Sequence, residues 1–154
     1  MDEILGNIYS LLKSFYGESL SEYLWGYNCS TQNYDLDLLY NQFGMIAIIS
    51  AIVIPPIYYY AWNPVRHQQL KYWVLMIVTG LINSVIVYCM LTSDLENGLI
   101  GDCLLYDNLG NQVIDTMNIV MFGVIDFFFT SILFFFTSMA LFKWRSKAVK
   151  HYPF

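Results

Sequence analysis

The chain has 154 residues, enough for one domain, and 57% of them are hydrophobic. Only 12% are charged, against roughly 25% in an ordinary soluble domain, so lipid is the expected solvent for much of the chain. The formal net charge is −5. Because no large basic patch is present, the sequence argues against a nucleic-acid partner.

Acidic and basic segments alternate along the chain. Six acids lie in residues 1–39 and five in residues 92–116. The basic residues outside those segments are Arg66, Lys71, Lys143, Arg145, Lys147 and Lys150. By the positive-inside rule, residues 63–72 and the tail 143–154 are expected in the cytoplasm, and the two acidic segments on the other side. The six basic residues are therefore predicted to contact anionic lipid or a cytoplasmic partner.

Residues 2–16 carry apolar side chains at helical spacing, with polar residues between them. This pattern predicts an amphipathic helix that is too polar to span a bilayer. It is expected to lie in the membrane interface, to dock on a partner, or to pack on the protein's own outer loop.

Three apolar stretches then predict an all-α integral membrane protein with three transmembrane helices. The expected order is an outer N-terminal region (1–39), a first span (40–62), a cytoplasmic loop (63–72), a second span (73–91), an outer loop (92–116), a third span (117–142) and a cytoplasmic tail. Pro55 and Pro56 are expected to kink or end the first helix, because proline has no N–H to donate.

The outer loop carries two short apolar runs around an Asp-Asn-Leu-Gly-Asn turn, which predict a small β-hairpin over residues 103–114. Cys29 and Cys103 fall on the same predicted side of the membrane, so a disulfide between them is one expectation and free, buried thiols are the other. No metal site is expected, since close Cys/His spacing is missing from the sequence.

The third span separates bulky from small residues. Phenylalanine triplets at 127–129 and 134–136 form a bulky, lipid-suited face. Gly123, Thr130 and Thr137 recur every seven residues and predict a seam for a partner helix. Gly80 and Ser84 form a similar small pair in the second span.

Asp126 is the acid inside that seam. It lies about 13 Å from the outer end of its span, and Asn83 lies at about 12 Å in the second span. Exposure of a carboxylate to lipid costs at least about 2.5–3.5 kcal/mol, so Asp126 should face protein or water. Three roles remain open: a hydrogen bond to Asn83 with the acid protonated, a contact with another subunit, and a proton or cation path. Thr130, one helical turn away, is expected in the same polar contact.

No catalytic or cofactor-binding residues are predicted, because the sequence holds no nucleophile–base arrangement and no phosphate-binding loop. The leading hypothesis is a non-enzymatic subunit or anchor of a larger assembly in the plasma (inner) membrane. The expected partners are the lipid bilayer and other membrane subunits or further copies of the chain. The alternatives are a homo-oligomeric channel or membrane-disrupting effector with Asp126 facing the lumen, and a membrane immunity or exclusion protein.

Overall fold

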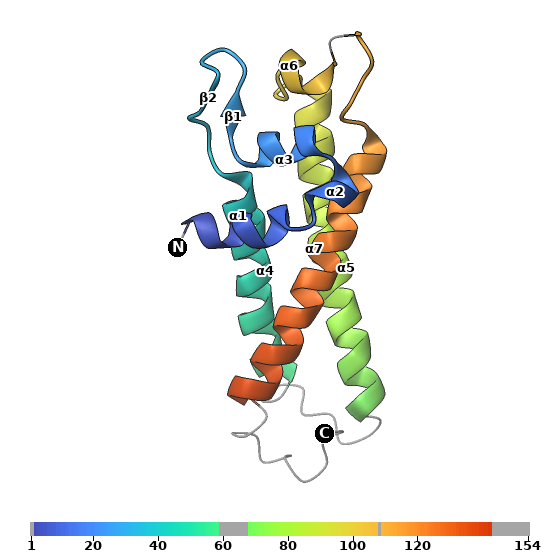
Figure 1. Ribbon diagram of the computed structural model, residues 1–154. Helices are drawn as coiled ribbons and strands as arrows, with labels where there is room; N and C mark the ends of the chain where they lie inside the picture. Colours follow the sequence, from blue (N-terminus) through green and yellow to red (C-terminus); the bar gives the residue numbers. More distant parts are fainter. Residues whose placement is uncertain (1, 59–67, 108, 143–154) are drawn as a thin grey trace. The chain divides into compact units, whose positions relative to one another are not determined.

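A computed structural model describes residues 2–58, 68–107 and 109–142 (Figure 1). The described chain is mostly helical. Three of its helices are long and apolar enough to cross a membrane, over Leu39–Pro56, Leu70–Glu96 and Thr116–Ala140. The protein is therefore a membrane protein with three candidate spans, and the predicted fold class is confirmed.

The elements follow one another as Figure 1 labels them. They are α1 (Asp2–Ser10), α2 (Lys13–Tyr16), α3 (Glu18–Leu24), β1 (Tyr27–Asn28), β2 (Asn33–Tyr34), α4 (Leu39–Pro56), α5 (Gln68–Glu96), α6 (Asp102–Leu105), α7 (Thr116–Thr137) and the π-helix η2 (Ser138–Phe142). The regular helix α4 ends at its two prolines.

The chain divides into two compact units, which we describe separately. Unit 1 holds Met1–Met45 and Val85–Ile125, and unit 2 holds Ile46–Ser84 and Asp126–Phe154. Unit 1 thus contains the short N-terminal helices, the hairpin and the loop between α5 and α7. Unit 2 contains the remaining parts of the three long helices.

Unit 1 shows why the predicted amphipathic helix is not continuous. The backbone turns after Ser10, where the N–H of Leu12 donates to the carbonyl of Tyr9 (3.0 Å). A second break falls at Gly17, whose φ of +96° favours glycine. A side chain there would also collide with Asn118, whose Nδ2 would lie 2.7 Å from an added Cβ.

The start of α7 and the end of α5, both in unit 1, have a recognisable cap. Asp115 and Asn118 bond to each other's backbone N–H at the start of α7, in the manner of a capping box. At the end of α5, Gly98 takes a φ of +68°. The N–H of Leu99 donates to the carbonyl of Asp94 and that of Gly98 to Leu95, which is the Schellman pattern.

The β-hairpin lies in a different place from the predicted one. β1 and β2 pair antiparallel, with Tyr27 opposite Tyr34. The prediction of a hairpin over residues 103–114 is wrong in its first half, since Asp102–Leu105 is the helix α6. The turn itself is present, and a single antiparallel bridge joins Tyr106 to Gln112 beyond it. The run Cys-Leu-Leu is too short to distinguish a strand from a helix by its sequence.

The core of unit 1 is aromatic. Tyr9, Tyr16, Tyr40, Phe43 and Phe122 are each at most 1% exposed. Their rings pack around Phe122, with centroid distances of 5.1 Å to Tyr16 and 5.9 Å to Phe43. Such pairs stabilise a core by about 0.5–1.5 kcal/mol beyond the area that they bury.

The core of unit 2 combines aromatic rings with small residues. Ala51, Tyr58, Tyr72 and Phe134 form a buried cluster. The prediction that both phenylalanine triplets form a lipid-suited face holds for Phe128 and Phe136, which are 58% and 63% exposed. It is wrong for Phe134, which is fully buried, because a run of three consecutive residues on a helix points in three directions.

Candidate functional site

A buried polar cluster lies within the membrane-spanning part of unit 2. The side-chain amide of Asn83 donates to Ser50 Oγ at 2.7 Å and to Thr130 Oγ1 at 3.3 Å. Asn83 is 3% exposed and Thr130 is fully buried. These bonds join residues of α4, α5 and α7, so the cluster can hold the three helices in one register.

Ser50 is the member of the cluster that the sequence analysis missed. Its hydroxyl donates to the carbonyl of Ala47 on the same helix, at 2.9 Å, and accepts from Asn83. The sequence did contain a signal, since Ser50 is the one polar side chain in the run from Met45 to Ile54. A lone hydroxyl among apolar residues of a span is a candidate for an interhelical bond.

Asp126 lies one helical turn before Thr130 and is 1% exposed. Both amide hydrogens of Asn83 are directed at Ser50 and Thr130. An Asn83–Asp126 bond would therefore use the carbonyl oxygen of Asn83 and a protonated acid. That bond stays a prediction. The burial of Asp126 agrees with the expectation that an intramembrane acid avoids lipid.

The predicted packing residues occupy buried or half-buried positions. A Cβ at Gly80 would come within 2.8 Å of both the Phe127 ring and Ser131 Oγ, so this glycine permits close approach of α5 and α7 in unit 2. Thr137 Oγ1 lies 2.7 Å from the carbonyl oxygen of Ala51 on α4. Ser84 is half-buried in unit 2, and Gly123 is buried in unit 1.

The structure joins Cys29 and Cys103 in a disulfide, with the two Cα atoms 5.9 Å apart and a separation of 74 positions in sequence. The bond ties the hairpin to α6. Gly101 lies against it, because an added Cβ would collide with Cys29 Sγ. Cys89 is a free, exposed thiol.

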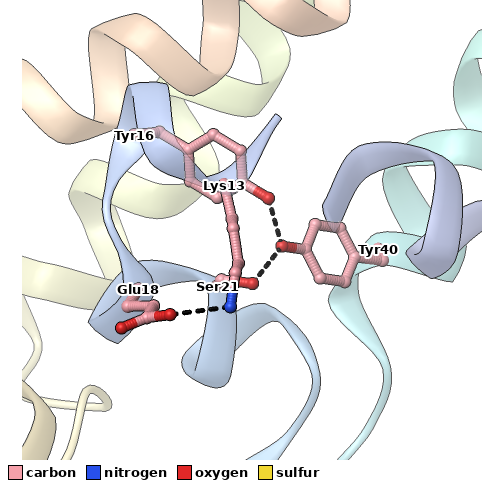
Figure 2. Close-up of polar contacts among 5 residues, drawn as sticks. All are labelled: Lys13, Tyr16, Glu18, Ser21 and Tyr40. Carbon is pink, nitrogen blue, oxygen red and sulfur yellow. Dashed lines mark hydrogen bonds and ion pairs between the residues drawn. The ribbon is translucent and has the colours of Figure 1, made fainter. Parts of the chain in front are cut away.

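A hydroxyl network connects the short helices of unit 1 to α4 (Figure 2). Tyr40 donates to Ser21 Oγ at 2.9 Å, and the hydroxyls of Tyr16 and Tyr40 are hydrogen-bonded to each other. Burial raises the pKa of Tyr16, while its bonds to Tyr40 and Ser21 act in the opposite direction. The Lys13–Glu18 ion pair in the same view is exposed.

A second feature of unit 1 is a pocket of about 390 Å³. It is lined by Tyr23, Gly26, Leu36, Asp37, Leu39, Gln42, Asp94 and Leu99. Tyr23 donates to Asp94 Oδ2 at 3.0 Å. Burial first, and then the negative charge of Asp94, raises the pKa of Tyr23 well above its ordinary value, so the hydroxyl keeps its proton. Leu36 and Leu99 remain 49% and 62% exposed at the pocket.

The predicted cytoplasmic contact residues are mostly beyond the described structure. Lys71 is half-buried in α5. The others, Arg66, Lys143, Arg145, Lys147 and Lys150, lie outside the described residues. Within the part of the chain that the structure describes, no group of three or more His, Cys, Asp or Glu side chains is placed to hold a metal ion.

Comparison with protein families, with curated proteins and with solved structures gives no match to this chain. The function is therefore argued from the residues alone.

Proposed function

We propose that the protein is a non-enzymatic subunit or anchor of a larger membrane assembly, and that unit 1 contacts its partner. The observation that carries this proposal is the exposure of large apolar side chains outside the candidate spans. Leu36, Leu99 and Leu109 are 49%, 62% and 84% exposed, and none of them belongs to a spanning helix. Exposed leucines beyond the spans favour a protein contact.

The pocket of unit 1 is the best-formed part of this surface. The backbone holds Leu36 in place, since its N–H donates to the carbonyl of Gly26 at 3.1 Å. Leu99 is held by the Schellman pattern at the end of α5. The backbone at both leucines is thus ordered before a partner binds, which lowers the entropy cost of forming an interface.

The charge of this region favours a basic partner. Segments 1–39 and 92–116 hold eleven acids, and Lys13 is their one basic residue. Asp37 and Asp94 line the pocket beside the leucines. A partner segment with an apolar side chain next to Lys or Arg would complement both features.

The same proposal places unit 1 outside the cytoplasm and the basic tail inside, in the plasma (inner) membrane. Charge alternation supports this orientation, and the Cys29–Cys103 disulfide supports an oxidising compartment for unit 1. A thiol reagent that cannot cross membranes should label a cysteine placed at Asn111 in intact cells and should miss one placed at Ser146. The reverse labelling would contradict the orientation.

The polar cluster of unit 2 supports a structural role over a channel. A lumen-lining acid must meet water, whereas Asp126 is 1% exposed within a single chain. The alternative is a homo-oligomeric channel, in which several copies of the chain would assemble with Asp126 facing a shared lumen. A subunit of an assembly is surrounded by other proteins, and a homo-oligomeric channel by copies of itself. The mass of the native complex therefore distinguishes the two functions.

The proposal is tested by the mass of the complex extracted gently from native membranes. The unmodified chain should run in a complex that contains other proteins. Leu99→Asp should release it, because a carboxylate cannot occupy an apolar site, while the backbone bonds of residue 99 are retained. Asn97→Asp adds the same charge at an exposed neighbouring position and should leave the complex intact. A mass equal to one copy or to a whole multiple of this chain would contradict the proposal.

A further inference from the structure

The N-terminal helices expose an apolar stripe. Ile4, Ile8, Leu11 and Phe15 are 59%, 41%, 81% and 67% exposed. Ile4 and Ile8 lie one helical turn apart on the same side of α1, and Leu11 and Phe15 follow in the turn after α1 and in α2. Large apolar side chains that are exposed beside packed and polar positions are expected to be covered by another apolar surface.

The surface of α1 has three sectors, because successive residues of a helix are rotated by about 100°. One sector packs inside unit 1, where Tyr9 stacks on Tyr40 with ring centroids 5.7 Å apart. A second, polar sector contains Asn7 and Ser10, which line an open hollow of about 340 Å³. The third sector carries Ile4 and Ile8, the part of the apolar stripe that belongs to α1. An interfacial helix beside a membrane protein needs these three contacts: protein, water and lipid.

The contacts of α1 fix its position along the axes of α4 and α7. Leu5 lies against Gly44, since a Cβ there would come 2.8 Å from Leu5 Cδ1. Tyr9 packs on Phe122, with ring centroids 5.5 Å apart. From the starts of α4 and α7, these contacts are about 8 and 9 Å along each helix. α1 therefore packs near the N-terminal ends of both candidate spans, where an interfacial helix would lie.

The two contacts also indicate the direction of α1. They lie at nearly equal distances along α4 and α7 although they are four residues apart on α1, so α1 runs from α4 toward α7 at the level of their second turns (Figure 1). The neighbours of the contacted residues are exposed apolar side chains of the spans, Met45 at 46% and Met121 at 36%. The stripe therefore lies at the same level along the spans as their exposed apolar side chains, which face lipid.

We propose that α1 and α2 lie in the plane of the membrane, with Ile4, Ile8, Leu11 and Phe15 inserted among the lipid acyl chains. The lipid bilayer covers the stripe, and the polar sector of α1 faces water. The N-terminal segment is thus a fourth membrane-embedded element that does not span. This inference does not depend on the proposed function, because a chain without protein partners would place α1 in the same way.

Spin labels in the full chain test the proposal. The Cys29–Cys103 disulfide protects two cysteines, and Cys89→Ala removes the third. Single cysteines then replace Leu11, Phe15, Asn7 and Asn111, and each labelled protein is placed in a nanodisc at one copy per disc. Power saturation compares collisions with oxygen, which concentrates in lipid, and with a water-soluble nickel chelate. An unchanged helical content and an intact disulfide show that each labelled chain has folded.

Labels at residues 11 and 15 should collide more with oxygen than with nickel, and labels at residues 7 and 111 should show the reverse. Nickel collisions at residues 11 and 15 as frequent as at Asn111 would place the stripe in water and overturn the proposal. Low collision rates with both reagents would mean that the stripe is buried against protein, which also overturns it. Because each disc holds one copy, contact with a second chain is excluded.

Discussion

The two units are stabilised in different ways. In unit 1, long-range contacts join short elements: the disulfide, the bond of Tyr23 to Asp94, and the bond of Asn118 Nδ2 to the carbonyl of Tyr16 at 2.9 Å. In unit 2, small polar side chains such as Asn83 and Thr137 bond one helix to another.

The difference follows from helix length. α1, α2, α3 and α6 have 9, 4, 7 and 4 residues, and isolated helices shorter than about 12–15 residues are marginal in water. They depend on tertiary contacts to stay folded. The long helices satisfy their own backbone groups, as the membrane requires, so side-chain bonds there select the packing. Breaking one contact should therefore disturb unit 1 more than unit 2.

The largest expected effect is the loss of the disulfide. Cys29→Ser combined with Cys103→Ser should destabilise unit 1 by about 2–4 kcal/mol, since cross-links act mainly by restricting the unfolded chain. Hydrogen exchange should speed up in the hairpin and in α6 and stay unchanged in unit 2. Cys89→Ser is the matched control because Cys89 is a free, exposed thiol. Equal exchange in the double variant and the control would show that unit 1 does not need the bond.

The next effect concerns the hydroxyl network. Tyr40→Phe should destabilise unit 1 by about 1–3 kcal/mol, because buried partners of the lost hydroxyl are left with fewer bonds. Tyr34→Phe removes a hydroxyl from a residue that is 58% exposed and should have little effect. Exchange rates of α3 amides measure both variants. A Tyr40→Phe protein that exchanges like Tyr34→Phe would contradict the role of the network.

Unit 2 should respond less to the loss of one polar contact. Asn83→Leu should weaken helix packing by about 0.6 kcal/mol for each bond lost and by at most about 1.7, the average and the maximum from double-mutant cycles on interhelical hydrogen bonds. A double-mutant cycle with Thr130→Val isolates the Asn83–Thr130 bond. Ile82→Val, at a residue that is 54% exposed, serves as the control. A coupling energy of zero would mean that the cluster does not select the packing.

The smallest effect is expected for the Lys13–Glu18 pair, whose side chains are 49% and 76% exposed. A hydrogen bond and the charge of Lys13 lower the pKa of Glu18 from its ordinary 4.5. The contribution of the pair is present above that value and is lost as the pH falls through the lowered pKa. Lys13→Gln should return the Glu18 pKa toward 4.5 in an NMR titration, with stability at neutral pH unchanged. An unshifted Glu18 pKa would show that the pair does not form in solution.

Much of this architecture was predictable. The three spans follow from apolar runs that are long enough to cross a bilayer. Matching depth pointed to a contact between Asn83 and Asp126, which stays a prediction, whereas the structure shows Asn83 bonded to Ser50 and Thr130. The hairpin was misplaced because its strands have two residues each, below the length at which periodicity is informative. The pocket at Leu99 could not be predicted, because it joins residues far apart in sequence, such as Tyr23 and Asp94, which are 71 positions apart. The burial of Phe134 was predictable from the seam, because Phe134 lies four residues after Thr130 and three before Thr137 and so shares their face of α7.

Ion flux tests the central claim, that Asp126 and its neighbours hold helices together and do not conduct. The unmodified protein and Asp126→Asn are reconstituted into liposomes, and proton and cation flux is measured across an imposed gradient. We expect no flux above empty liposomes for either protein, since a buried acid within a packed cluster offers no path for ions. Robust flux in the unmodified protein that is lost in Asp126→Asn would contradict the account and make the channel the leading function.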